Sequence, residues 1–314
     1  AAVGVIPEEP SGAGFNIEGL AIAPNGSAYL AFRAPIVPAT ARTRALIVSI
    51  NNLAALVSGN PSAGPASFGA PIQLDLGGRG IRSLECNASE CLIIAGPASA
   101  GSFRLYTWNG AASSKPVERG ADLSGLNPEA IVELPATLTA ASVIEILSDL
   151  GDSVFYGDGV IAKDLPQDNW KKFRSDRITL GAAPTLSIAD ASVVEGNNGS
   201  APVQLTVTLS APVSNTVTVD YASGDGTATL ADGDYQSATG TLSFAPGQTS
   251  ATLTVPINGD LTLEPAETVS IDLSNAQGAS IVDAQALVTV NNDDSASVAI
   301  DSVSVPEGNS GSST

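Results

Sequence analysis

The chain has 314 residues, which is more than one β-sandwich needs, so we expect at least two domains. Its 13 basic and 32 acidic residues give a formal net charge of −19, which repels nucleic-acid phosphate, so no nucleic acid is expected as a partner. The sequence contains no Met and no run of membrane-spanning length. We therefore expect a processed protein or a piece of a longer one, without a membrane span in this part.

Residues 1–183 contain apolar runs of strand length that are separated by turn residues. A Pro-Asn-Gly-Ser turn at 24–27 joins the first two runs and predicts a hairpin. Groups of about four runs recur every 45–60 residues or so, which is typical of the blades of a β-propeller. The predicted strands are 16–23, 28–33, 44–50, 71–76, 80–86, 91–95, 103–108, 116–119, 128–134, 142–148, 153–156 and 170–179.

The amino-acid sequence of this region resembles a bacterial family of uncharacterised β-propellers. The resemblance rests on FNIEGLAIAPNGSAYLAFRAP, RGIRSLEC, CLIIAGP and LNPEAIVEL, in which a strand with EGLA marks the inner end of a blade. Residues 1–183 hold only about two and a half to three blades, whereas a closed ring usually needs four or more. We therefore predict an incomplete, propeller-like region.

The two cysteines, Cys86 and Cys91, lie between two of these strands. A zinc site would need more ligands, and the chain contains no His. We interpret the pair as a small hairpin disulfide, which implies an oxidising compartment. Two reduced, buried thiols are the alternative.

Charged side chains in the same region raise the question of a catalytic channel. A propeller channel lined by acids and arginines could hold a substrate, and related propellers include phytases and lactone-cleaving esterases. The chain has no His and no G-x-S-x-G motif, so no catalytic set can be assembled from it. We therefore favour salt bridges between blades for these residues: Glu18, Glu85, Glu129, Glu145, Arg33, Arg79, Arg82 and Arg104.

After a short linker at 180–185, residues 184–294 show the pattern of an antiparallel sandwich. Short runs rich in Val, Thr, Ile and Leu alternate apolar and polar residues, and Gly, Asn, Asp or Pro punctuate them. The predicted strands are 185–188, 202–209, 215–221, 240–244, 249–257, 266–273 and 284–290. The acids of this region gather at strand ends and in loops.

This region contains the segments SVVEGNNGS, SGDGTATLADGDY, FAPGQTSATLTVPINGD, LEPAETVSIDLSN and VTVNNDD. These segments resemble the Calx-β domain, a calcium-binding module with an immunoglobulin-like fold. The resemblance implies Ca²⁺ as the cofactor and implies that acids from several loops meet at one pole of the sandwich. The implied ligands are Glu195, Asp225, Asp260, Glu264, Asp293 and Asp294.

Other acids of the same region have supporting roles in this interpretation. We read Glu267 as a support for its loop, and Asp232 and Asp234 as turn-forming residues. The loops carry fewer acids than those of the strongest calcium sensors of the family, which suggests one or two sites of modest affinity. The alternative is that all these acids only cap loops and form salt bridges.

Residues 295–314 repeat the start of the preceding domain's sequence, because SVAIDSVSVPEGNSGSS at 297–313 is similar to LSIADASVVEGNNGS at 186–200. We predict the first strand of a second Calx-β domain, with Val298, Ile300, Val303 and Val305 at apolar positions. An unpaired strand is a template for another chain, so this segment is a candidate for self-association by strand addition. A disordered stub is the alternative.

These observations together predict an all-β protein of the extracellular space or cell surface. Its expected regions are a partial propeller (1–183), an immunoglobulin-like Calx-β sandwich (184–294) and the first strand of a second one (295–314). The expected function is that of a calcium-binding structural or adhesive component of a surface, matrix or filament, acting through protein contacts. The alternative function is a secreted phytase-like or esterase-like propeller hydrolase with the Calx-β module as an accessory.

Overall fold

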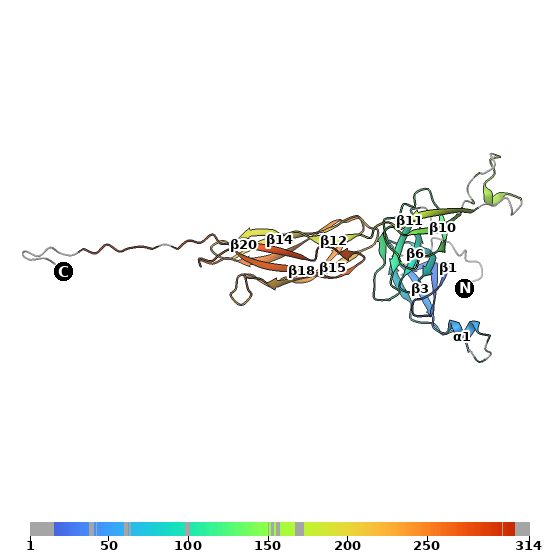
Figure 1. Cartoon of the computed structure of the whole chain (residues 1–314), viewed down its shortest axis with the longest axis horizontal. Coiled ribbons are helices and arrows are strands. Elements are labelled where there is room, and N and C mark those ends of the chain that lie inside the picture. Colours follow the sequence, from blue (N-terminus) through green and yellow to red (C-terminus); the bar gives the residue numbers. More distant parts are fainter. Residues whose placement is uncertain are drawn as a thin grey trace, which may run out of the picture.

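Two four-stranded antiparallel sheets open the chain, and each is a simple meander (Figure 1). In a computed structural model, the described residues are 16–37, 43–59, 64–97, 101–149, 158–166, 173–296 and 298–304, with the single residues 41, 62, 151 and 154. The first sheet consists of β1 (Asn16–Ile22), β2 (Ala28–Val37), β3 (Arg44–Ile50) and β4 (Ile72–Asp75). The second consists of β5 (Gly80–Cys86), β6 (Cys91–Gly96), β7 (Arg104–Trp108) and β8 (Val117–Arg119).

A third antiparallel sheet has the order β11-β10-β9. Its strands are β9 (Pro128–Glu133), β10 (Val143–Asp149) and β11 (Phe173–Thr179). A short helix, α1 (Leu53–Val57), follows β3, and a 3-10 turn, η1 (Ala162–Asp164), lies between β10 and β11. The predicted strand at 153–156 lies outside the described residues except for Val154, which belongs to no strand. Among the described residues, no helix has the length and apolar character needed to cross a bilayer.

The second sheet is buried on both faces, and the run CLIIAG of β6 explains why. All six of its residues are buried. Because side chains alternate along a strand, Ile93 joins the core shared with the first sheet, while Leu92 and Ile94 join the core shared with the third. Burying one such side chain contributes about 1.5–3 kcal/mol. Propeller blades are also stacked antiparallel meanders. This packing is therefore compatible with the propeller interpretation, which stays a prediction.

Ion pairs connect the first strands of the three sheets. Arg82 Nη1 on β5 lies 2.9 Å from Glu129 Oε1 on β9 and 3.8 Å from Glu18 Oε2 on β1. Arg33 Nη1 on β2 lies 3.0 Å from Glu18 Oε1. Arg82 thus forms salt bridges between sheets, as the sequence favoured, whereas Arg33 and Glu18 pair within the first sheet. In the same region, Cys86 and Cys91 form a disulfide that closes the β5–β6 hairpin.

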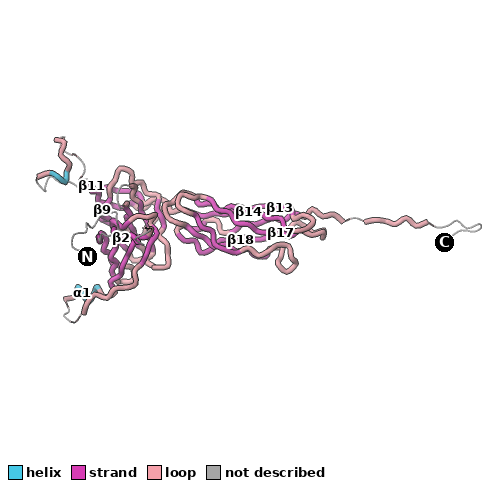
Figure 2. The backbone as a smooth tube through the Cα atoms, turned by 180° about the vertical axis from the view of Figure 1, so that it is seen from behind, coloured by secondary structure: helices cyan, strands magenta, loops and turns pink. Residues whose placement is uncertain are grey.

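The second half of the chain is a sandwich of two sheets with the orders β17-β14-β12-β19 and β13-β20-β18-β15-β16. Its strands run along the long axis of the molecule (Figure 2). They are β12 (Thr185–Ile188), β13 (Ala191–Val194), β14 (Ser200–Leu209), β15 (Val217–Asp225), β16 (Thr239–Phe244), β17 (Ser250–Asn258), β18 (Glu267–Gln277), β19 (Ser280–Ile281) and β20 (Gln285–Asn291). The all-β sandwich is thereby confirmed, and each of its seven predicted strands is present.

Strands β13 and β19 were not predicted from the sequence. The chain crosses from one sheet to the other between β12 and β13, where the Asp190 carboxylate accepts a hydrogen bond from Leu287 N at 2.8 Å. After this crossing, β13 pairs in parallel with β20. Beyond the sandwich, residues 298–304 extend away from it (Figure 1), and the side chains of Val298 and Ile300 are 92% and 93% exposed. Val305 lies outside the described residues.

Candidate metal centre

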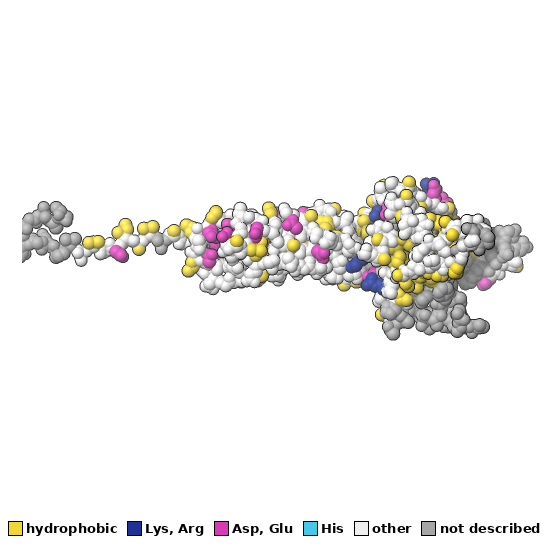
Figure 3. Space-filling view, turned by 90° about the horizontal axis from the view of Figure 1, so that it is seen from below, with side chains coloured by type: hydrophobic (Ala, Val, Ile, Leu, Met, Phe, Trp, Pro, Cys, Tyr) yellow, Lys and Arg dark blue, Asp and Glu magenta, His cyan; other side chains and the backbone are white. Residues whose placement is uncertain are grey.

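Acidic side chains collect at the end of the sandwich that faces away from the N-terminal sheets (Figure 3). The parallel pairing of β13 with β20 is one cause, because Val194 lies opposite Asn291 and both strands end at the same pole. The residues that follow each strand, Glu195 and Asp293, are therefore brought together. The loop at 259–266 between β17 and β18 reaches the same pole. We call this end of the sandwich the acidic pole.

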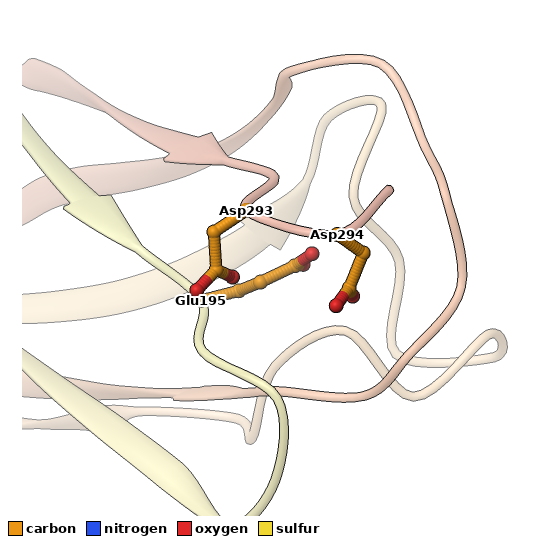
Figure 4. A group of neighbouring side chains, drawn as sticks. All are labelled: Glu195, Asp293 and Asp294. Carbon is orange, nitrogen blue, oxygen red and sulfur yellow. The ribbon is translucent and has the colours of Figure 1, made fainter. Parts of the chain in front are cut away.

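The first acidic group consists of Glu195, Asp293 and Asp294, whose carboxylate oxygens lie within 4.8 Å of one another. Figure 4 shows the three side chains next to one another, just beyond the ends of β13 and β20. Asn292 Nδ2 donates to Glu195 Oε1 at 2.8 Å, and Asn197 Nδ2 donates to Asp294 Oδ1 at 2.7 Å. These amides fix the carboxylates in place.

The second acidic group consists of Asp234, Glu264 and Glu267, which meet the same 4.8 Å limit. Asp234 belongs to the turn that follows β15, where its Oδ2 accepts a hydrogen bond from Thr229 N at 2.7 Å. Glu267 begins β18, and Glu264 lies three residues before it in the preceding loop. Two loops from different parts of the sequence thus build this group.

Desolvation, and after it the charges of neighbouring carboxylates, raises the pKa values of carboxyls in both groups. Burial is the largest cause for Glu195, and the carboxylates of Asp260, Glu264 and Asp294 add to the rise of its pKa. The pKa of Glu264 is raised by desolvation and then by Asp234 and Asp260. Because the charge of Asp260 raises the pKa values of both Glu195 and Glu264, the two groups are electrostatically coupled.

No basic side chain offsets this charge within the sandwich. Residues 178–314 contain 15 Asp and Glu and no Lys, Arg or His. Glu195 is only 7% exposed, and Asp294 Oδ2 is buried without a hydrogen-bond partner. A buried carboxylate oxygen without a partner is costly unless a cation meets it. Calcium takes six to eight oxygen ligands, with carboxylates prominent among them, so the residues present fit this ion.

The six ligands named from the sequence fall into three classes of position. Glu195, Asp293 and Asp294 form the first acidic group, and Glu264 lies in the second. Asp260 belongs to neither, although its charge acts on both, and its Oδ1 accepts a hydrogen bond from Thr262 N at 2.6 Å.

Asp225 lies outside both groups. Its Oδ1 accepts hydrogen bonds from Tyr235 Oη at 2.7 Å and from Leu230 N at 2.9 Å, and these bonds lower its pKa. The carboxylate of Asp225 therefore braces the turn at 225–235. Conversely, Asp234 and Glu267, which the sequence suggested as a turn former and a loop support, join Glu264 in the second group. The two-residue spacing of acids in DGDY was the signal available for Asp234.

A family model described as the Calx-beta domain matches residues 182–295. Residues 182–295 are a Calx-beta domain. The match confirms the resemblance, and its bounds lie within two residues of the predicted ones. A second model, described as a protein of unknown function (DUF3616), matches residues 6–150. This match agrees with an uncharacterised family for the N-terminal region. No curated protein matches the chain.

Solved structures that are similar to this chain include domains of Calx proteins. The crystal structure of CBD12 from CALX1.2 is 26% identical over 35% of this chain and 44% of that chain, with a TM-score of 0.32. The apo-form Calx CBD1 domain is 25% identical over 35% of this chain and 98% of that chain, with a TM-score of 0.33. The chain thus spans less than half of the length of the CBD12 structure.

Proposed function

We propose that the acidic pole of the Calx-beta domain binds calcium and that the bound ions stiffen this end of the sandwich. The observation that carries the proposal is the first acidic group, in which buried Glu195 lies beside Asp293 and Asp294 while Asp294 Oδ2 has no partner. Because residues 178–314 contain no basic side chain, the counter-charge has to come from solution. Membership of the Calx-beta family supports calcium as that cation.

Each acidic group would hold one ion, and main-chain and water oxygens would complete the coordination. Asp260 acts on the pKa values of Glu195 and Glu264, so it is positioned to contribute to either ion. Magnesium demands near-ideal octahedral geometry and usually keeps several waters, whereas calcium tolerates irregular cages of carboxylates. We expect dissociation constants of about 0.1–1 mM, as in other extracellular modules.

The ions would tie together segments that otherwise repel one another. In the first acidic group an ion joins the end of β13 to the end of β20, and in the second it joins the turn after β15 to the loop before β18. Calcium would turn this repulsion into attraction. The result is a stiffer pole at the point where the chain leaves the domain, after Asp294.

Calcium titration of the whole chain, followed by thermal unfolding and isothermal calorimetry, tests the proposal. At a few millimolar calcium, mass action contributes on the order of 1–2 kcal/mol to the free energy of unfolding. The double variant Glu195→Gln and Asp293→Asn should lose the part of this gain that the ion of the first acidic group contributes. The matched control is Asp283→Asn, which removes an exposed carboxylate outside both acidic groups and should keep the full calcium response. An equal response in the double variant and the control would contradict the site.

We further propose that the protein works outside the cell as a structural or adhesive component that acts through protein contacts. A disulfide suits an oxidising compartment. The functional units in this proposal are residues 1–183, 184–294 and 295–314. The long, acidic sandwich would act as a calcium-stiffened spacer.

Self-association through residues 298–303 belongs to the same proposal. In the repeat, Val298 and Ile300 correspond to Leu186 and Ile188 of β12. Leu186 and Ile188 are buried between the sheets of the sandwich, whereas Val298 and Ile300 face solvent. The segment therefore has the sequence of a strand that becomes buried in a Calx-beta sandwich. A second copy of this chain offers edge strands to which such a segment can add, and contacts repeated head to tail would build a filament.

A further inference from the structure

The loop at 210–216, between β14 and β15, lies at the end of the sandwich opposite the acidic pole and contacts the first and second sheets. We propose that this loop is a docking plug that joins the Calx-beta domain and the N-terminal sheets into one rigid body. The interface is then an interaction surface in its own right, with the N-terminal sheets as its partner. None of its residues belongs to the proposed calcium site.

A buried carboxylate of the second sheet receives the plug. Glu118 on β8 is 8% exposed, and its Oε2 accepts hydrogen bonds from Ser214 N at 2.7 Å and from Ser214 Oγ at 2.5 Å. The hydroxyl of Tyr106 lies 2.7 Å from Ser214 Oγ. On the other side of the carboxylate, Arg104 Nε lies 3.0 Å from Glu118 Oε1. Bonds to a charged acceptor are stronger than neutral ones, and their geometry selects one orientation.

A second carboxylate, from the first sheet, receives the next part of the plug. Asp75 Oδ2 accepts a hydrogen bond from Thr216 N at 3.3 Å. Between these two contacts, Asn215 is fully buried and its Nδ2 donates to Pro116 O at 3.0 Å. Buried backbone N–H groups almost always have partners. For Ser214 and Thr216 the structure gives those partners on the N-terminal sheets.

Side-chain contacts extend the interface to the strands of the sandwich. Lys115 Nζ donates to Thr218 Oγ1 at 3.0 Å, and Lys115 N donates to Gln277 Oε1 at 3.3 Å. Thr218 lies on β15 and Gln277 ends β18, so two strands of one sheet are held from the same point. A contact on two strands resists rotation of the sandwich about its long axis.

The connecting segment that the sequence suggested as a linker is also fixed. Gly120 N donates to Ala182 O at 2.9 Å, and Arg119 Nη2 donates to Gly181 O at 2.9 Å. Gly181 has φ +77°, and a Cβ there would lie 2.4 Å from the carbonyl carbon of Gly120. Only glycine allows this approach. Domains within one chain move relative to one another by default unless their interface holds them, and here both the plug and the connection are held.

Amide hydrogen exchange measured by NMR on the whole chain tests the docking directly. Among the residues that the structure describes, the amides of Ser214 and Thr216 donate to carboxylates of the N-terminal sheets, whereas the Gly247 amide donates to Val213 O within the sandwich at 2.8 Å. A docked plug predicts protection of Ser214 and Thr216 by about 100-fold or more over an unstructured peptide. If these two amides exchange without protection while Gly247 stays protected, the two halves are not docked and the proposal is overturned.

A pair of glycine variants tests the same interface by displacement. Gly77 follows β4 with φ +63°, and a Cβ there would lie 2.4 Å from Ser214 O. Gly125 has φ +71° with open space around it, so Gly125→Ala imposes similar backbone strain without the clash. In Gly77→Ala we expect the protection of Ser214 and Thr216 to fall about tenfold or more, with Gly247 unchanged. Unchanged protection in Gly77→Ala, equal to that in Gly125→Ala, would contradict the plug.

Discussion

Glu85 and Glu118 are two partly or wholly buried carboxylates of the second sheet in different environments. Glu118 accepts hydrogen bonds from Ser214 and pairs with Arg104. Burial alone raises the pKa of Glu85, since no neighbouring charge contributes to the shift. A carboxyl with a raised pKa in the folded state binds its proton more tightly there than in the unfolded chain. Its contribution to folding is present at low pH and is lost as the pH rises through the folded pKa.

Glu85→Gln should remove this loss of folding stability at higher pH. At pH 7 the variant should have a higher urea midpoint than the wild type, and the difference should shrink to nothing below about pH 4, where an unfolded-state glutamate is protonated. Urea unfolding at pH 4, 5, 6 and 7 measures the effect. The control is Glu133→Gln on β9, an exposed carboxylate, for which no comparable difference is expected. A wild type that matches the variant at every pH would show that the burial of Glu85 has no energetic effect.

At the same scale, residue types indicated the acidic pole but not the orientation of each side chain. Glu195 and Asp293 follow strand-forming runs, so their position at a strand end could be read from the sequence. Asp225 also follows such a run, yet Tyr235 and Leu230 bind its carboxylate. Whether an acid faces the pole or its own turn depends on partners five and ten residues away, and a local pattern does not specify them.

Among the strands, alternation of apolar and polar residues was sufficient wherever a strand is long and half buried. β14 shows this pattern, with every second residue from Val203 to Leu209 buried. The two missed strands have four and two residues, and both pair in parallel with distant segments. Their existence depends on β20 and β12, not on their own sequence. For the stacking of the three N-terminal sheets, the sequence signal was the wholly apolar run of β6.

The β5–β6 hairpin offers a test at the scale of an element. Cys86 and Cys91 are five residues apart in sequence, so their disulfide closes a short loop. Chain entropy makes such a bond worth about 2 kcal/mol. The double variant Cys86→Ala and Cys91→Ala should lose about this much stability in urea unfolding, and a reductant should destabilise the wild type but not the variant. Recovery of both cysteines as free thiols by non-reducing peptide mapping would refute the pairing.

Over the whole molecule, the acidic pole and the contacts with the N-terminal sheets lie at opposite ends of the sandwich, along the long axis (Figure 3). All 13 Lys and Arg lie in residues 1–177, and the sandwich carries acids alone. The plug fixes one end of the sandwich, and the proposed calcium site stiffens the other. The Glu118–Ser214 contact joins residues 96 positions apart, and the Asp75–Thr216 contact joins residues 141 apart. Neither contact could be predicted from the sequence, because each forms only after both regions have folded.

Self-association is the prediction that belongs to this scale. Side chains alternate along an extended segment, so Val298 and Ile300 share one face while Ala299 lies on the other. If the first face becomes buried in a second copy, Ile300→Asp places a charge in an apolar contact, whereas Ala299→Asp adds the same charge outside it. Sedimentation velocity over a range of concentrations, in millimolar calcium, should show assembly by the wild type and by Ala299→Asp. The Ile300→Asp variant should stay monomeric, as should a chain that lacks residues 296–314. Assembly of the shortened chain to the same extent as the full one, or a wild type that stays monomeric at every concentration, would exclude strand addition through this segment.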